Sequence, residues 1–263
     1  MPLEKEPSGA RSVETEVEVP GTPEQVWEAI ATGSGISSWF VPTTCDQKVG
    51  GTTTSEFGPG MASEAMITEW RPPRMFAAEA QQEPGRIGTE WHIEARDGGT
   101  CIVRVVHRWF AETDEWDDQF EGHMVGWQSF FRILRIYLEH FSGEASSGFA
   151  LSHFRAAPGD EVWGALTESL GECSQGDSVS TPSGAATVEH SGDDRRTELL
   201  LRLERPAGTV HVFPMDLGEQ TLLSARAYLY GATADEAADA EERWNRWLEE
   251  TLPGEPVRPS FDG

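Results

Sequence analysis

The chain opens with a strand-like alternation that leads into a capped helix. Valine and threonine alternate with glutamate over residues 13–19, which is the period of a strand with one buried and one solvated face. Thr22, Pro23 and Gln25 then match an N-cap, a first-turn proline and a capping-box partner. The pattern predicts a strand followed by a helix that ends near Ala31.

Short strands are expected after this helix. The Gly33–Gly35 run should end it, and residues 36–40 should form one further helical turn. From residue 41 to 110 the chain reads as strands separated by glycine and proline turns. The clearest pair is a hairpin around Asp97-Gly98-Gly99. Its expected inward positions are Thr89, Trp91, Ile93, Ala95, Cys101, Val103, Val105, His107 and Trp109.

A long amphipathic helix closes the first half of the chain. From about Asp118 to Phe141, aromatic residues and leucines recur at spacings of three and four, so one side of this helix must be buried. The segment Gly143–Gly148, rich in serine and glycine, is the best linker candidate. It predicts a domain boundary near residue 145.

The second half repeats this order of elements in a weaker form. Residues 149–155 predict a strand, 158–169 a helix and 173–184 a polar, serine-rich loop. The closing helix starts at a capping box formed by Thr233 and Glu236. Further strands are expected at 186–190, 197–203, 210–215 and 221–230.

Two short segments indicate how the halves are related. Pro23–Ile30 and Gly159–Leu166 carry Val-Trp at matching positions, and each is followed by strands and an aromatic helix. Chance similarity between two amphipathic helices is the alternative. Duplication predicts an α+β fold in which a curved antiparallel sheet wraps a long C-terminal helix, in two tandem copies. The predicted parts are a disordered tail at 1–11, helix-grip domains at 12–143 and 149–253, and a tail at 254–263.

The charge of the chain and its lack of targeting features limit the expected classes of binding partner. A formal net charge of −25 without a basic block makes nucleic acid and anionic membranes poor partners. The sequence has no membrane-spanning apolar run and no signal-like N-terminus, so membrane insertion is not expected. Cys45, Cys101 and Cys173 lack a paired spacing, which argues against disulfides or a zinc site and fits the reducing cytoplasm.

Catalytic and metal-binding motifs are missing from the sequence. It has no Gly-x-Ser-x-Gly elbow, no His-Glu-x-x-His and no phosphate-binding glycine loop. An acidic cluster does not match an EF-hand loop, and carboxylates at a helix N-terminus explain it. Its members are Asp114, Glu115, Asp117, Asp118 and Glu121. No metal and no cofactor are expected, and a binding protein is favoured over an enzyme.

The order strand, capped helix, antiparallel strands and long aromatic helix resembles the START-like, Bet v 1-like (SRPBCC) superfamily. Residues 17–30, Trp39-Phe40, 123–127 and Tyr137-Leu138 are similar to the branch named after the activator of Hsp90 ATPase homologue 1. The similarity is good over 12–142 and weak over 149–252. Its motifs are structural, so they indicate a fold more than a function.

The resemblance implies a cavity between the long helix and the concave side of the sheet, where many relatives hold a hydrophobic molecule. It also implies two alternatives, an enzyme like the polyketide cyclases and aromatases in which His107 moves a proton, and a partner of an Hsp90-type chaperone. A homodimer is a further partner that the sequence permits. For each aromatic residue, filling of the core is the alternative role. The predicted ligand-binding residues are Trp39, Phe40, Trp70, Trp91, His107, Trp109, His123, Trp127 and Phe131.

Overall fold

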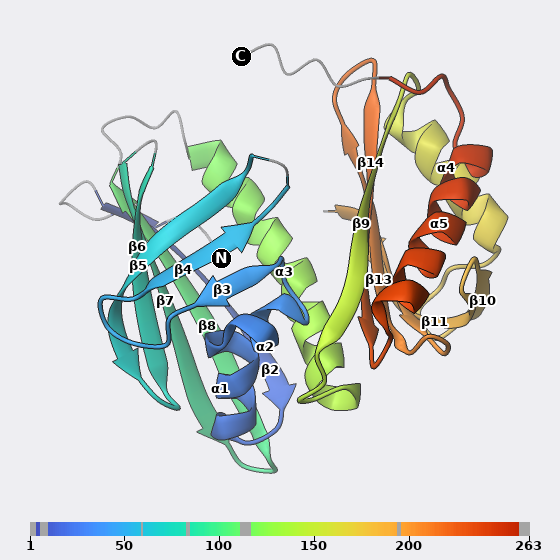
Figure 1. The fold of residues 1–263 in the computed structure, drawn as a ribbon. Helices are drawn as coiled ribbons and strands as arrows, with labels where there is room; N and C mark the ends of the chain where they lie inside the picture. Colours follow the sequence, from blue (N-terminus) through green and yellow to red (C-terminus); the bar gives the residue numbers. More distant parts are fainter. Residues whose placement is uncertain are drawn as a thin grey trace. The chain divides into compact units, whose positions relative to one another are not determined.

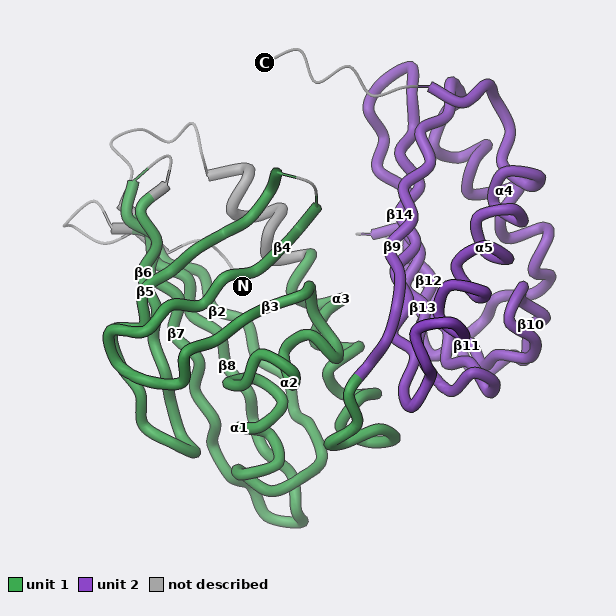
Figure 2. Tube along the Cα trace, in the orientation of Figure 1, with its two compact units in different colours: residues 1–145 green, residues 146–263 purple. Residues whose placement is uncertain are grey.

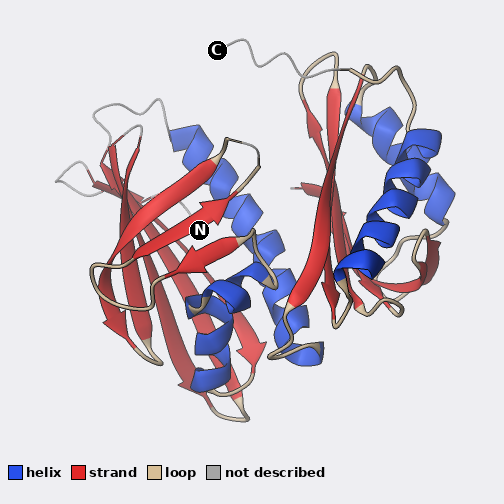
Figure 3. Cartoon of the chain, viewed as in Figure 1, coloured by secondary structure: helices blue, strands red, loops and turns tan. Residues whose placement is uncertain are grey.

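The structure, a computed structural model, describes residues 4–5, 10–58, 60–82, 85–110, 117–193 and 196–257, and for 4–5, 10, 82, 110 and 117–125 it describes the backbone alone. The chain divides into two compact units, Met1–Ala145 and Ser146–Gly263, here the first and second unit (Figure 2). Each unit has its own antiparallel sheet and its own helices (Figure 3). Each can therefore bury a core of its own.

The sheet of the first unit is an antiparallel meander whose first long strand pairs with its last. In spatial order its strands are β1 (Glu4–Lys5), β2 (Ala10–Pro20), β8 (Thr100–Phe110), β7 (Gly85–Arg96), β6 (Met75–Gln82), β5 (Ala62–Arg71), β4 (Thr52–Glu56) and β3 (Thr43–Cys45). Part of the segment expected to be a disordered tail lies in strands. Glu4 and Lys5 pair with Ser12 and Arg11, which satisfies their backbone groups.

The predicted hairpin forms β7 and β8. Arg96 lies opposite Thr100 across the turn, where Gly98 and Gly99 have φ angles of 86° and 80°. Such angles are open to glycine at little cost. The tryptophans and valines of the inward register are buried, but Ala95 is exposed because it lies at the end of its strand.

Of the three helices described in the first unit, two match their sequence patterns. Helix α1 (Pro23–Ala31) begins with the predicted capping box, in which Thr22 and Gln25 exchange hydrogen bonds of 2.9 and 3.4 Å. Helix α3 (Asp117–His140) follows the expected long helix closely and packs mainly against β2 (Figure 1). The sheet curves around this helix, as a helix-grip fold requires.

Helix α2 (Gly33–Ser37) corrects the expected course of the chain. The glycine run lies inside a second helix, because the Thr32 hydroxyl accepts a hydrogen bond from the Gly35 N–H at 3.0 Å and starts a new helix immediately. A Cβ atom on Gly35 would lie 1.9 Å from the Glu28 carbonyl oxygen. Glycine is therefore needed for the close approach of α1 and α2, and the expected turn at 36–40 begins earlier.

The second unit repeats the arrangement with fewer elements. Its sheet has the order β10 (Ser178–Thr181), β11 (Gly184–Asp193), β12 (Arg196–Leu203), β13 (Gly208–Asp216), β14 (Thr221–Tyr230) and β9 (Ser146–Arg155). Helices α4 (Gly159–Leu170) and α5 (Ala234–Thr251) cover one face of this sheet (Figure 1). The Thr233–Glu236 capping box forms as predicted.

Two polar segments of the second unit are strands where loop was expected. Ser146–Gly148, the second half of the linker candidate, belongs to β9 because these residues pair with 228–230. The serine-rich segment 173–184 contains β10, whose Val179 lies opposite Ala186 and is buried in the core. Both segments are polar, so their composition did not predict strands. They are strands because backbone hydrogen bonds pair them with neighbouring strands.

Both units have the same chain topology. The first long strand of each pairs with the last, β2 with β8 and β9 with β14, and a helix, α1 or α4, follows that first strand. The predicted α+β helix-grip fold in two tandem copies is confirmed. Of the expected C-terminal tail, Pro256 bridges to Arg155 and the Val257 N–H donates to Phe154, while 258–263 lie outside the described residues.

Candidate functional site

A cluster of aromatic rings surrounds Trp127 on the concave side of the first sheet. Phe40 stacks on Trp127 with a centroid distance of 5.2 Å and an interplanar angle of 8°. Trp91 meets the same ring edge-on at 5.2 Å, and the rings of His107 and Phe131 lie at 5.4 and 5.7 Å. Such offset and edge-to-face pairs are the favoured aromatic geometries.

Three parts of the fold place these rings. Trp91 and His107 occupy inward positions of β7 and β8, which alternate with solvent-facing charged residues. Trp127 and Phe131 are four residues apart on α3 and therefore lie on the same side of the helix. Phe40 comes from the segment after α2. The cluster thus joins three regions that are distant in the sequence.

One polar pair lies beside Trp127. His107 Nδ1 and the Thr89 hydroxyl are 3.0 Å apart, as their direct opposition in the β7–β8 ladder allows. Both side chains are half-buried. A few polar groups within apolar walls are typical of small-molecule sites, where they orient the ligand.

The nine predicted ligand-binding residues separate into groups. Phe40, Trp91, His107, Trp127 and Phe131 come together in the ring cluster. Trp39 contacts Phe40 and Trp91 but is fully buried, with its indole N–H donating to the Ala29 carbonyl at 2.8 Å. That bond ties Trp39 to the core.

The other three predicted residues are Trp70, Trp109 and His123. Trp109 is fully buried. Trp70 packs against Trp27 and Phe76 at centroid distances of 4.8 and 5.5 Å, in a neighbouring group of rings. The side chain of His123 is outside the described residues.

Sequence reasoning missed some neighbours of the cluster. Phe130 meets Phe40 at 4.5 Å, and Phe57 meets it from another side at 5.7 Å. Phe57 is 44% exposed and Met61, at the far end of the same β4–β5 turn, is 56% exposed. The sequence could have predicted Thr89 as a site residue, because Thr89 shares the inward register of His107. Nothing in the sequence around Phe57 indicates its position at the rim.

Two surface hollows lined by described residues lie elsewhere in the first unit. The larger, about 460 Å³, is on the outer face of the sheet, over β2, β6, β7 and β8. The smaller, about 280 Å³, lies between α1, α2 and the end of α3 and is lined mostly by small polar residues. Neither is lined by a predicted ligand-binding residue.

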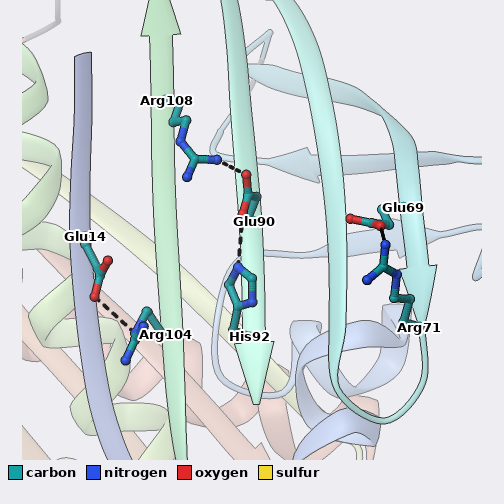
Figure 4. A network of polar contacts seen from close by, with 7 residues as sticks. All are labelled: Glu14, Glu69, Arg71, Glu90, His92, Arg104 and Arg108. Carbon is teal, nitrogen blue, oxygen red and sulfur yellow. Dashed lines mark hydrogen bonds and ion pairs between the residues drawn. The ribbon is translucent and has the colours of Figure 1, made fainter. Parts of the chain in front are cut away.

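Exposed ion pairs line the larger hollow. Arg104 forms ion pairs with Glu14 and Glu16 at 3.1 and 3.3 Å. Figure 4 shows the pair with Glu14 and the contacts of Glu90 with Arg108 and His92. Burial and the nearby Arg104 lower the pKa of His92. Solvent-exposed pairs of this kind contribute little binding or folding free energy. They keep the outer face of the sheet soluble.

Metal binding and thiol chemistry find no suitable groups among the described residues. They contain no group of three or more His, Cys, Asp or Glu side chains that could hold a metal ion. The acidic cluster at 114–121 has no described side chains. Burial raises the pKa of the Cys45, Cys101 and Cys173 thiols, so they stay protonated and are poor nucleophiles. Among the described helices none is long and apolar enough to span a membrane.

Comparison with known proteins identifies the first unit. Residues 20–139 match the sequence model of the family described as "Activator of Hsp90 ATPase homolog 1-like protein". The family match lies within the first unit and spans most of it. The match covers the capped helix, the whole sheet beyond β2 and nearly all of α3, and confirms the resemblance in the sequence. No curated protein matches the chain.

Several solved structures are similar to this chain. Protein MLL2253 from Mesorhizobium loti is 20% identical, with coverage of 50% of this chain and 99% of its own, at a TM-score of 0.45. DynU16 from the dynemicin biosynthetic locus and the di-domain ARO/CYC BexL from the BE-7585A pathway are each 14% identical. Both alignments cover 92% of this chain and 95% of the other, at TM-scores of 0.44 and 0.46. At this level of similarity, the functions of these proteins do not transfer to the chain.

Proposed function

We propose that the first unit binds a flat hydrophobic small molecule against Trp127, between α3 and the concave face of the sheet. The observation that carries the proposal is that Trp127 is only half-buried although it lies at the centre of a ring cluster in which Phe40, Trp91 and Phe131 are buried. Aromatic surface left in contact with water is unfavourable, and a ligand that covers it gains that free energy.

Two neighbouring features support this site. The Thr89–His107 pair offers hydroxyl and imidazole groups next to the Trp127 ring, where they can orient one polar atom of a ligand. The exposed side chains of Phe57 and Met61 place apolar surface near Phe40 at the rim. A hydrophobic molecule can contact this surface on its way to the cluster.

A binding experiment with a matched control tests the proposal. The full chain is titrated with the fluorescent hydrophobic probe 1-anilinonaphthalene-8-sulfonate, and freshly purified protein is examined for bound small molecules by native mass spectrometry. Trp127→Leu should weaken probe binding at least tenfold. The control is Trp247→Leu, because Trp247 is also a half-buried helical tryptophan but lies on α5 of the second unit.

Two results would count against the site. One is equal probe affinity for the Trp127→Leu and Trp247→Leu proteins. The other is a protein that carries no small molecule and binds no probe although it is folded.

A second candidate function is acid–base catalysis on the bound molecule by His107, as in polyketide cyclases. It is favoured by the contact of His107 with Trp127, which places an imidazole beside the bound ring. Turnover of an aromatic polyketide that disappears in His107→Ala, with probe binding retained, would support catalysis. Unchanged turnover would remove His107 from the mechanism.

Interaction with an Hsp90-type chaperone and homodimer formation stay predictions. A pull-down with purified Hsp90 and sedimentation of the full chain would test them.

A further inference from the structure

The outer face of the second sheet, opposite α4 and α5, carries a compact group of polar side chains. Helix-facing positions on β13 and β14 are apolar, and the alternate positions hold Thr209, His211, Arg226 and Tyr228. In the β13–β14 ladder Thr209 lies directly opposite Tyr228, and His211 lies directly opposite Arg226. These four residues are therefore mutual neighbours on one face.

The carboxylate next to this group already has its partners. Glu198 is 1% exposed, accepts a hydrogen bond from His211 Nε2 at 2.8 Å and forms an ion pair with Arg196 Nε at 3.3 Å. His190 Nε2 lies 3.3 Å from its other oxygen. Burial lowers the pKa of His211 despite the nearby carboxylate, so the imidazole is neutral at physiological pH. Arg196 thus balances the charge of Glu198.

Arg226 has no such counter-charge. It forms no ion pair with the described residues, and one of its guanidinium nitrogens, Nη1, is buried without a hydrogen bond of normal geometry to them. The hydroxyl of Thr209, which is 0% exposed, also lacks a hydrogen bond to them. The hydroxyl of Tyr228, which is 3% exposed, interacts with the Arg226 guanidinium, but its own proton has no acceptor among them. Buried polar groups nearly always have partners, so three such donors on adjacent positions point to an acceptor.

The protonation state of the Tyr228 hydroxyl is consistent with a donor role. Burial raises the pKa of Tyr228 to about 12, although the Arg226 guanidinium acts in the opposite direction. The hydroxyl therefore keeps its proton and can donate. Thr209 and Arg226 also carry donor hydrogens, so the group offers donors to one shared ligand.

We propose that Arg226, Tyr228 and Thr209 bind the carboxylate of a small organic acid. One unpaired guanidinium matches one negative charge, and a carboxylate has two oxygens that can accept from the guanidinium and both hydroxyls. A dianionic phosphate fits less well, because the Glu198 carboxylate is held by the adjacent His211 and repels a second charge. This site is in the second unit and does not depend on the proposed function of the first.

The test uses the full chain and benzoate as the probe. Binding is followed by amide NMR shifts of β13 and β14, with benzyl alcohol and inorganic phosphate at matched ionic strength as comparisons. Benzoate alone should shift these resonances. Arg226→Gln should weaken its binding at least tenfold. Arg246→Gln should not, because Arg246 is an exposed arginine on α5 that pairs with Glu242.

Thr209→Val separates a binding role from a structural one. Removing a buried hydroxyl that lacks a partner should raise the melting temperature of the ligand-free protein. If the hydroxyl serves the ligand, the same change weakens benzoate binding severalfold. A rise in stability with benzoate affinity unchanged would remove Thr209 from the site.

Other outcomes would overturn the proposal as a whole. These are the absence of benzoate-induced shifts in β13 and β14, or equal affinity of the wild-type and Arg226→Gln proteins. If the wild type is a dimer that Arg226→Gln converts to monomer, the carboxylate comes from a second copy of the chain. The small-molecule proposal is then wrong.

Discussion

Matched tryptophan-to-phenylalanine changes at Trp39 and Trp127 separate the core of the first unit from its candidate site. The two side chains contact the same rings, Phe40 and Trp91. Trp39 is fully buried and donates a hydrogen bond to the Ala29 carbonyl, whereas Trp127 is only half-buried. Trp39 should therefore govern folding and Trp127 should govern binding.

The structure sets the size of each effect. Trp39→Phe loses the indole hydrogen bond, at a cost of about 1 kcal/mol. The smaller ring leaves a void in the core that costs about 1 kcal/mol more. The sum of ~2 kcal/mol corresponds to a fall of roughly 4–8 °C in the melting temperature of a unit this size. Trp127→Phe should cost about 0.5 kcal/mol or less, because its ring is partly solvated. It should weaken probe binding about fivefold through lost ring contact.

Hydrogen-exchange mass spectrometry measures the first effect separately for each unit. Peptides from β7 and β8 report the free energy of opening of the first unit, and peptides from β12 and β13 are the internal control. Probe titration of the same proteins measures the second effect. The reasoning is refuted if Trp127→Phe destabilises β7 and β8 as much as Trp39→Phe does while probe affinity is unchanged.

Three further predictions concern stability. Burial lowers the pKa of His153 and His211 below 6.5 in the folded protein. When the pH falls through 6.5, the unfolded chain therefore binds more protons than the folded chain, and the stability of the second unit decreases. Its urea midpoint should be higher at about pH 7.5 than at about pH 5.5, and equal midpoints would contradict this. Thr233→Ala removes the N-cap of α5 and should lower the free energy of unfolding by about 1 kcal/mol, whereas Thr233→Ser should preserve it. Arg104→Gln removes exposed ion pairs and should change the free energy of unfolding of the first unit by less than about 0.5 kcal/mol. A loss above about 1 kcal/mol would show that these ion pairs on the outer face stabilise the fold.

Local signals accounted for most of the secondary structure. The capping boxes at Thr22 and Thr233 and the glycine turn at 97–99 act within a few residues, so the sequence alone places them. Elements that depend on distant backbone partners were harder to foresee. β10 and the start of β9 are polar in composition and become strands because a neighbouring strand satisfies their hydrogen bonds.

The sequence by itself determined the helix-grip topology, its repetition and the inward register that holds Trp91 and His107. Only the tertiary structure decided which aromatic residues form a core and which form a candidate site. Trp39 and Trp127 look alike in the sequence, but one is sealed by a hydrogen bond to α1 and the other keeps contact with water. The same is true of Arg226, which forms no ion pair with the described residues because the β13–β14 register places it opposite His211 and not opposite a carboxylate. Burial and charge pairing are properties of the assembled fold, because they depend on which distant segments come together.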